Sequence, residues 1–350
     1  MFLITESYFY MTMSKQKKKS ILRRFIILNF ILWLTLALSI PAVMFGPDKL
    51  RFTDNDWDNF SFVPDYNTTE WNILLDSHSH TKYSDGKLTP RQNILWHIAM
   101  GFNAMVLTDH NSFRGVEKIR EIARNEYDDK IKVFAGLEWT TSRCHLTLIF
   151  PTHVTAEEYE SVLKFRSYTH TPTDDEIKEV ITETKELGGL VGVNHYPLSD
   201  RYLLNQPSRL QFYDWGIDFF EILNGKSYDY LSHKFSLDNG LGVLSATDMH
   251  VPGPVHSWTL LNVSEFTEEA IFTELKQKRT SYLFDLDGSP YDVEHKNNPG
   301  YIFLSPLIQI GSMLNSMYRS DRFLSLAFVL IGFIYLTFIV LEVLRKLFKP

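Results

Sequence analysis

Short apolar runs alternate with amphipathic segments through the middle of the chain. Runs rich in β-branched residues predict strands over residues 72–76, 104–109, 132–139, 144–150, 189–195, 218–225 and 242–250. Helical character between them predicts helices over residues 90–100, 113–127, 155–165 and 173–189. Strands that alternate with helices predict an α/β fold built on a parallel sheet or barrel.

Two long uncharged runs flank this alternating region. Residues 25–45 and 323–341 each reach the length of about 20 apolar residues that a membrane-spanning helix needs. A cleaved signal peptide is the alternative for the first run, but the run exceeds the usual core of roughly 7–15 residues. A buried core helix is the alternative for the second, but that run is apolar on all faces. We therefore predict two transmembrane helices around a domain over residues 50–320.

Basic residues predict the orientation of both spans. Lysines and arginines crowd residues 14–24, just before the first run, and Arg345, Lys346 and Lys349 follow the second. Basic flanks stay on the cytoplasmic side of a membrane. We therefore expect residues 1–24 and 342–350 in the cytoplasm, and the domain between the spans outside it.

Composition narrows the classes of function. The chain has 350 residues, a formal net charge of −7 and one cysteine, Cys144, so it has no intrachain disulfide framework. The middle of the chain carries no basic stripe, and no nucleic-acid polymer is expected as a partner. Nothing in the sequence identifies a protein partner.

Polar side chains suited to metal binding stand at the ends of the predicted strands. In a barrel, the loops after the strands meet at one face, so we expect these side chains to converge there. Imidazole and carboxylate groups are ligands for zinc, manganese or iron. Alternation along a strand lets His78 and His80 face the same pocket. The set is Asp76, His78, His80, Asp109, His110, Glu138, His145, His195, Asp248 and His250.

A structural role is the alternative for every histidine. A lone histidine is usually a hydrogen-bonded structural residue, and both readings stay open for His256. For the strand-end set, the structural alternative requires many buried polar groups with separate partners, which is costly without a cation. We assign the structural role to His97, His153, His170, His233 and His295.

The order of the motifs resembles a known family. HSHTKYSDG, LTDHN, GLE, a histidine seven residues later, NHYP and TDMH follow one another between residues 72 and about 260. This order is similar to the PHP (polymerase and histidinol phosphatase) metal-dependent hydrolases, including their CehA/McbA-like branch. The resemblance implies a distorted (β/α)7 barrel with two or three divalent ions at the C-terminal face of its strands.

The resemblance also implies which residues hold each ion. The first ion takes His78, His80, Glu138 and Asp248. The second shares Glu138 and adds His145 and His195. The third takes Asp85, His110 and His250.

Such a site favours hydrolysis of a small phosphorylated substrate. Two cations roughly 3.5–4 Å apart activate a water for attack on phosphorus. Asp248 and His250 are the candidates for handling protons. Arg143, Arg201 and Lys226 are the candidates for binding phosphate, with Arg143 closest to the catalytic ligands, because fixed cations donate to phosphate oxygens. The alternative for each cation is a solvated side chain.

Two other functions stay open. The same ligands could serve hydrolysis of a carboxylic ester, carbamate or amide, or a non-catalytic metal-binding sensor. Cationic groups in the pocket favour phosphate chemistry, whereas an apolar pocket favours the carbon-centred hydrolase.

Overall fold

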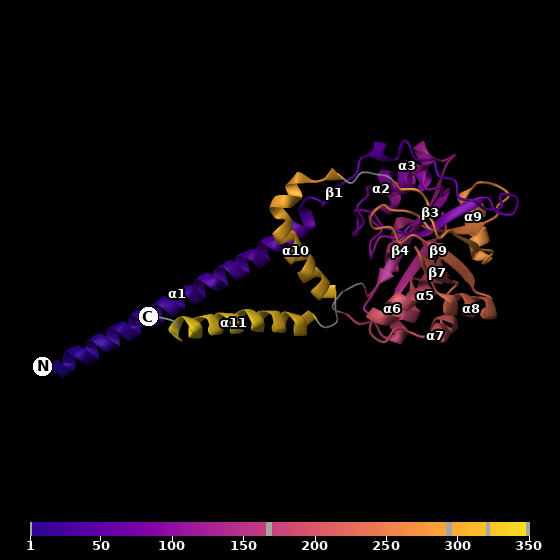
Figure 1. The fold of residues 1–350 in the computed structure, drawn as a ribbon. Coiled ribbons are helices and arrows are strands. Elements are labelled where there is room, and N and C mark those ends of the chain that lie inside the picture. Colours follow the sequence, from indigo (N-terminus) through magenta and orange to yellow (C-terminus); the bar gives the residue numbers. More distant parts are fainter. Residues whose placement is uncertain (1, 166–169, 292–295, 320–322, 348–350) are drawn as a thin grey trace. The chain divides into compact units, whose positions relative to one another are not determined.

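The computed structural model describes residues 2–165, 170–291, 296–319 and 323–347. The chain divides into two compact units (Figure 1). A helical unit comprises Met1–Lys49 and Asn297–Pro350, and an α/β unit comprises Leu50–Lys296. His295, assigned above to a structural role, lies outside the described residues.

A ten-stranded sheet forms the framework of the α/β unit. β2, β3 and β4 pair in parallel, as do β6, β7 and β9, whereas β5 and β10 run antiparallel to their neighbours. The order is β11 (Ser281–Phe284), β10 (Ser257–Leu261), β2 (Ile73–Ser79), β3 (Ala104–Leu107), β4 (Lys132–Thr140), β5 (His145–Phe150), β6 (Leu190–Val193), β7 (Phe219–Asn224) and β8 (Ser227–Tyr228), with β9 (Gly242–Ala246) also paired to β7.

The sheet curls until the end of β9 meets β2. The Asp248 amide donates to the carbonyl of His78 at 2.9 Å, and the His80 amide donates to the carbonyl of Met249 at 3.0 Å. Ser79 and Met249 form a parallel bridge. The result is a curled half-barrel, consistent with the distorted barrel that the resemblance implies.

The mixed sheet corrects the expectation of a parallel one. A parallel crossover needs a dozen or more residues, but only residues 141–144 connect β4 to β5. The chain must therefore return antiparallel as a hairpin, in which Glu138 pairs with Thr147 and Thr140 pairs with His145. The α/β class is confirmed, and all four predicted helices are present.

Helices cover the sheet (Figure 1). Threonine caps begin several of them, such as Thr89 before Pro90 and Thr173 before Asp174, where the hydroxyl accepts from a free backbone amide. The α/β unit contains η1 (Asp54–Trp57), α2 (Pro90–Ala99), α3 (Val116–Glu126), α4 (Ala156–Ser161), α5 (Asp174–Glu186), α6 (Tyr196–Tyr202), α7 (Arg209–Asp214), α8 (Tyr230–Asn239) and α9 (Glu268–Lys276), and also the two-residue strand β1 (Leu50–Arg51).

Strand alternation gives the two faces of the sheet different cores. On β4, Val133 and Ala135 pack with Ile119 of α3, whereas Phe134 packs with Ile271 of α9. The face that carries Phe134 changes character along the strand, because Glu138 lies on it at the C-terminal end. An apolar layer therefore supports a polar layer on the same face.

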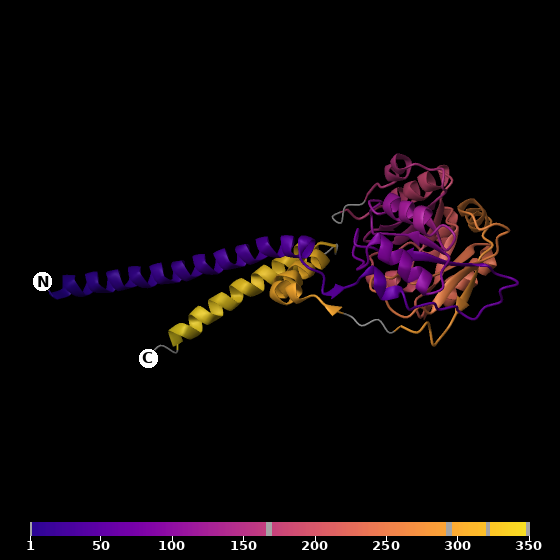
Figure 2. The same ribbon diagram turned by 90° about the horizontal axis from the view of Figure 1, so that it is seen from above.

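The helical unit consists of α1 (Phe2–Phe45), α10 (Pro299–Arg319) and α11 (Phe323–Leu347), with the two-residue strand β12 (Lys296–Asn297) at its border. α1 and α11 run in opposite directions (Figures 1 and 2). Arg24 donates to both carboxylate oxygens of Glu342 at 2.6 Å, and Tyr335 donates to Asn29 at 2.7 Å. Polar contacts thus hold the two helices together.

The expectation of two membrane spans is corrected to one candidate among the described residues. Lys19–Phe45 is long and apolar enough to cross a membrane, and the same test is met by signal sequences near an N-terminus. Residues 323–341 do form a helix within α11. Among the described residues, no second helix meets the same test.

Candidate metal centre

A β-bulge aims the first two ligand candidates. Leu75 packs with the apolar layer, so plain alternation would turn Ser77 and Ser79 toward the same face. The pairing of β2 with β3 shifts register between Asp76 and Ser79. Bulges redirect side chains in this way, and His78 and His80 reach the polar layer instead.

Glu138 lies at the middle of the polar layer and is fully buried. Its Oε1 lies 2.9 Å from His145 Nδ1 and 3.2 Å from His195 Nε2. Its Oε2 lies 2.7 Å from His110 Nδ1, and 3.4 Å and 3.6 Å from the Nε2 atoms of His78 and His80. One carboxylate therefore contacts five imidazoles from four strand ends.

Asp248 closes the group from the end of β9. Its Oδ1 lies 3.1 Å from His80 Nε2 and 3.4 Å from His78 Nε2, and its Oδ2 accepts from Asn224 at 3.0 Å. Glu221 of β7 lies 2.8 Å from His78 Nδ1. Glu221 thus orients His78 with its Nε2 toward the carboxylates of Glu138 and Asp248.

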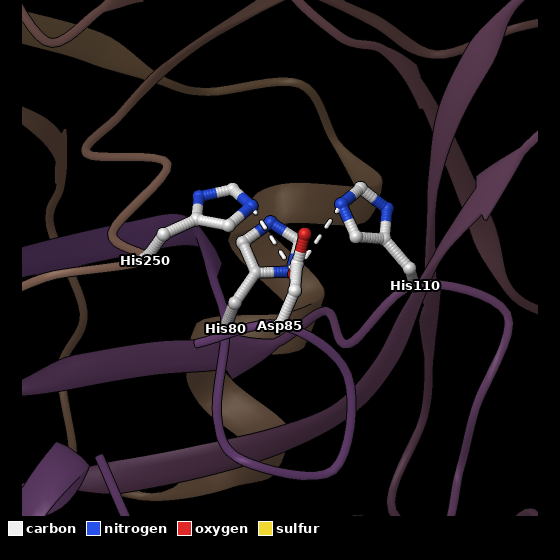
Figure 3. A group of neighbouring side chains, drawn as sticks. All are labelled: His80, Asp85, His110 and His250. Atoms are coloured by element: carbon white, nitrogen blue, oxygen red, sulfur yellow. Dashed lines mark ion pairs between the residues drawn. The ribbon is translucent and has the colours of Figure 1, made fainter. Parts of the chain in front are cut away.

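A second cluster extends from His80 (Figure 3). Asp85 Oδ1 lies 3.3 Å from His250 Nε2, 3.6 Å from His110 Nε2 and 4.0 Å from His80 Nδ1. The rings of His80 and His250 stack with their centroids 4.1 Å apart. This cluster contains the residues expected for a third ion and adds His80 to them.

Electrostatics set the protonation of these residues. Burial favours neutral His78, but the carboxylates of Asp248, Glu138 and Glu221 outweigh it and raise the His78 pKa well above its usual value. Burial lowers the pKa of His80 to about 4. Burial also opposes the charge of Glu138, yet His110, His78 and His145 hold its pKa well below the usual range. Neighbouring imidazoles thus sit in contrasting protonation states.

Unpaired atoms show that cations fit this site. His78 Nε2 and His80 Nδ1 are buried and make no hydrogen bond. Such atoms are costly unless something else binds them. Three groups place their ligand atoms within 4.8 Å of one another: His78, His80 and Asp248; His78, Glu138 and His195; and His80, Asp85, His110 and His250. Imidazole and carboxylate together suit zinc, iron or manganese.

Two of the ligand candidates have an unusual backbone. Asp248 has φ 52° and His195 has φ 28°, in the left-handed region that non-glycine residues rarely adopt. His195 precedes α6, and its amide donates to Glu221 Oε1 at 3.2 Å. Strained residues of this kind concentrate at functional sites.

Other polar residues from the strand ends are fully engaged in protein hydrogen bonds. Asp109 accepts from the Thr81 amide at 2.7 Å and from the Ser84 hydroxyl at 2.7 Å. His97 Nε2 lies 3.0 Å from Asp76, and buried His256 lies 3.0 Å from the carbonyl of Asp285. These residues support the loops.

Three more histidines with a predicted structural role lie within the described residues. His170 contacts Glu176 at 2.9 Å, and His233 Nδ1 contacts the Tyr228 hydroxyl at 2.6 Å. His153 is exposed. None of the three belongs to a potential metal cluster of the described residues.

A cavity of about 410 Å³ opens beside the ligand candidates. It is lined by His195, Pro197, Leu198, Arg201, Glu221, Asn224, Ser227, Tyr228 and Asp229. Arg201 is exposed and, within the described parts of the chain, has no hydrogen bond or ion pair. Lys226 is exposed in the β7–β8 turn, outside this lining.

Arg143, which we expected to bind phosphate, is engaged in other contacts. Its Nε and Nη2 donate to the carbonyl of Asn205 at 3.0 Å and 2.9 Å, and Nη1 donates to that of Pro172 at 3.0 Å. Its Nη2 also pairs with Asp174 at 2.7 Å. The guanidinium therefore fastens two loops, and Arg201 replaces it as the cation beside the cavity.

Sequence reasoning missed the polar partners of the ligands. Glu221 interrupts the apolar strand FFEILN, and that charge was the available signal. Asn224 bridges Glu221 and Asp248, at 2.8 Å and 3.0 Å. Asn194 donates to Glu138 at 3.2 Å. Amides carry no such signal, because they are common in loops.

Residues 76–206 match the model of the PHP domain. The resemblance is thereby confirmed as a PHP domain, without distinguishing the CehA/McbA-like branch. The match contains His78 through His195 and ends before Glu221, Asp248 and His250, which complete the centre. No curated protein matches the chain.

One solved structure shares the fold, and two others are similar over part of the chain. A two-domain protein from Bacteroides vulgatus, described as containing a predicted PHP-like metal-dependent phosphoesterase, is 22% identical with a TM-score of 0.50, over 65% of this chain and 68% of that one. A protein from Bifidobacterium adolescentis described as a metal-dependent phosphoesterase is 17% identical (TM-score 0.40, 53% and 92% covered). An amidohydrolase from Chromobacterium violaceum with bound sulfate is 18% identical (TM-score 0.43, 60% and 97% covered).

Proposed function

Starting from a PHP domain at residues 76–206, we propose that this chain is a metal-dependent phosphoesterase anchored in a membrane. The observation that carries the proposal is the set of buried imidazole and carboxylate groups around Glu138, in which ring nitrogens of His78 and His80 make no hydrogen bond. Structural polar groups in a protein interior are satisfied by the protein.

The residues divide among two or three ions. His78, His80, Glu138 and Asp248 would hold the first, and Glu138, His145 and His195 the second; Asp85, His110 and His250, with His80, would hold a third. Bound divalent cations would supply an activated water and neutralise charge on the phosphoryl oxygens. Glu221 and Asn224 fix the orientations of His78 and Asp248.

Arg201 of the pocket, and His250 and Asp248 of the ligand clusters, would serve the substrate. Arg201, which is exposed beside the cavity, donates to phosphate oxygens through its planar guanidinium. Burial opposes the charge of His250, but Asp85 outweighs it and raises the His250 pKa to about 9. When the cluster in Figure 3 holds no ion, His250 is protonated at neutral pH and donates from Nε2 to the leaving alkoxide. Asp248 accepts a proton within the centre.

The anchor determines where the reaction takes place. Lys19–Phe45 enters the bilayer, and the basic residues before it remain in the cytoplasm. The α/β unit follows this segment in the chain and therefore faces away from the cytoplasm. A reporter that works only outside the cytoplasm should be active when it is fused near residue 60. Activity of a reporter that works only in the cytoplasm, fused at the same position, would reject this orientation.

The function is tested with the full chain in detergent. Metal-stripped protein should be inactive, and manganese or zinc should restore hydrolysis of phosphomonoesters or phosphodiesters. Inorganic phosphate should inhibit at millimolar concentration. Faster hydrolysis of an uncharged carboxylic ester, without phosphate inhibition, would assign the same ligands to a carbon-centred hydrolase. Metal binding without turnover of either class would leave a sensor module.

A further inference from the structure

The cavity beside the metal centre has apolar side chains at its opening. Leu198 and Tyr228 both line the cavity, and they are 50% and 45% exposed. His195, a ligand candidate, lines the same cavity. Substrate at the metal centre would therefore extend past these two side chains toward solvent.

Three further exposed residues lie close in the sequence to residues that line the cavity. Tyr202 follows Leu198 by one turn of α6, and i and i+4 side chains share a helix face. Tyr230 and Leu231 begin α8 directly after Asp229, which lines the cavity. Their exposed fractions are 70%, 61% and 62% for Tyr202, Tyr230 and Leu231. We call the five residues the apolar rim.

The apolar rim differs from scattered surface leucines. Single exposed apolar residues are normal, but several around one opening mark a binding surface. Three of the five are tyrosines, whose apolar ring and polar hydroxyl suit the boundary between a membrane and water. The composition fits contact with lipid.

A short linker joins the α/β unit to the segment that we propose enters the bilayer. The apolar segment ends at Phe45 and the α/β unit begins at Leu50. The connecting residues 46–49 can extend over roughly 18 Å at most. A lipid in the same bilayer is thus within reach of the α/β unit.

We infer that the substrate is a phosphomonoester of a membrane lipid, an inference that rests on the proposed function. The phosphate lies at the metal ligands beside Arg201, and the hydrocarbon chain lies over the apolar rim. The oxygen of one water bonds to phosphorus, and the ester P–O bond breaks. One proton of that water passes to the leaving alkoxide, which gives a lipid alcohol and inorganic phosphate.

A binding experiment tests the inference apart from turnover. The metal-loaded full chain in nanodiscs is titrated with alkyl phosphonates from ethyl to decyl, and empty nanodiscs provide the subtraction. Each buried methylene should tighten binding by up to about fourfold, so the series should span at least about tenfold. Equal affinity for every chain length would overturn the inference.

Two leucines of α8 provide a matched pair of variants. Leu231→Ser should reduce the affinity ratio of decyl to ethyl phosphonate by about threefold, and adding Tyr202→Ser should reduce it further. Leu237 is 69% exposed on the same helix, outside the apolar rim, and Leu237→Ser should leave the ratio unchanged. Equal effects of Leu231→Ser and Leu237→Ser would also overturn the inference.

Rates of hydrolysis distinguish a failure of this inference from a failure of the proposed function. Phosphatidic acid in the nanodisc should be hydrolysed at least about tenfold faster than glycerol 3-phosphate. If both are hydrolysed equally, the phosphoesterase stands and the lipid substrate is rejected. The third outcome is that no phosphate ester is hydrolysed, while phosphonate affinity rises with chain length. In that case the proposed function fails, and the apolar rim still binds alkyl chains.

Discussion

Two buried groups of histidine and carboxylate adjoin each other along β2, and they differ in one respect. Asp76 accepts from the Thr247 hydroxyl at 2.5 Å and contacts His97 at 3.0 Å, while the other ring nitrogen of His97 contacts the carbonyl of Asn93 at 2.8 Å. In the group around Glu138, the buried ring nitrogens His78 Nε2 and His80 Nδ1 have no hydrogen bond. Glu138, His78 and His80 are as fully buried as Asp76 and His97.

The difference shows what marks a metal centre. Burial and charge are common to both groups, so neither property separates structure from function. A set of polar atoms that satisfies itself stabilises the fold, whereas a set with unpaired atoms requires another partner. The same distinction separates Arg143, whose donors are occupied, from Arg201.

The largest expected effect comes from Glu138→Gln. The amide cannot balance two cations, so metal content should fall and activity should drop by more than about a hundredfold, the upper range for weakened metal sites. Elemental analysis and phosphate release measure both. Asp76→Asn is the matched control, and it should retain its metal. Full metal occupancy and activity in Glu138→Gln would remove Glu138 from the centre.

Metal affinity at the cluster shown in Figure 3 should depend on pH. Because the His250 pKa is raised to about 9, a cation at this cluster must displace a proton at neutral pH. Affinity for manganese should rise by roughly tenfold per pH unit from 7 to 9 and then level off. Calorimetry in two buffers should detect the release of about one proton at pH 7. Affinity that is independent of pH would place the ion elsewhere.

The two arginines should separate in kinetics. Arg201→Ala removes a charge-assisted hydrogen bond to phosphate, and KM for a phosphate ester should rise by about tenfold. Metal content should stay unchanged, because arginine is not a ligand. Arg143→Ala should leave KM unchanged while loosening the loops at Asn205 and Pro172. An equal rise of KM in both variants would show that Arg201 and Arg143 do not differ in phosphate binding.

The smallest expected effect concerns the hydrogen-bonded group of Asp76 and His97. His97→Leu leaves Asp76 and the carbonyl of Asn93 without a partner, which should cost about 1–3 kcal/mol of unfolding free energy. Thermal unfolding should show a Tm lower by several degrees, since 1 kcal/mol corresponds to roughly 2–4 °C at this size. Metal content should match that of the unmodified chain. Loss of metal would show that the two groups are not independent.

The sequence was sufficient for the elements that carry a repeating pattern. Alternating apolar runs gave the strands, and histidines at strand ends gave the ligand candidates. The antiparallel return at β5 depended on the short link of residues 141–144, a constraint of chain length that hydrophobic patterning does not record. The bulge that turns His78 and His80 inward was likewise invisible, since plain alternation already placed the two residues on a common face.

Contacts between distant segments could not be predicted from the sequence pattern. The donors of Arg143 bind carbonyls at Pro172 and Asn205, residues far away in the sequence, so its engagement could not be inferred from local pattern. Glu221 and Asn224 act through neighbours on β2 and β9. Contacts between distant segments depend on topology, which a single sequence constrains weakly.

The closure of β9 onto β2 has a consequence for synthesis of the protein. The Asp248 amide meets the carbonyl of His78 across 170 positions of chain. Contacts of such long sequence separation form slowly and late in folding. A nascent chain that has only reached Glu138 holds the β2 histidines but lacks Asp248 and His250. Full metal loading therefore waits until the α/β unit is complete.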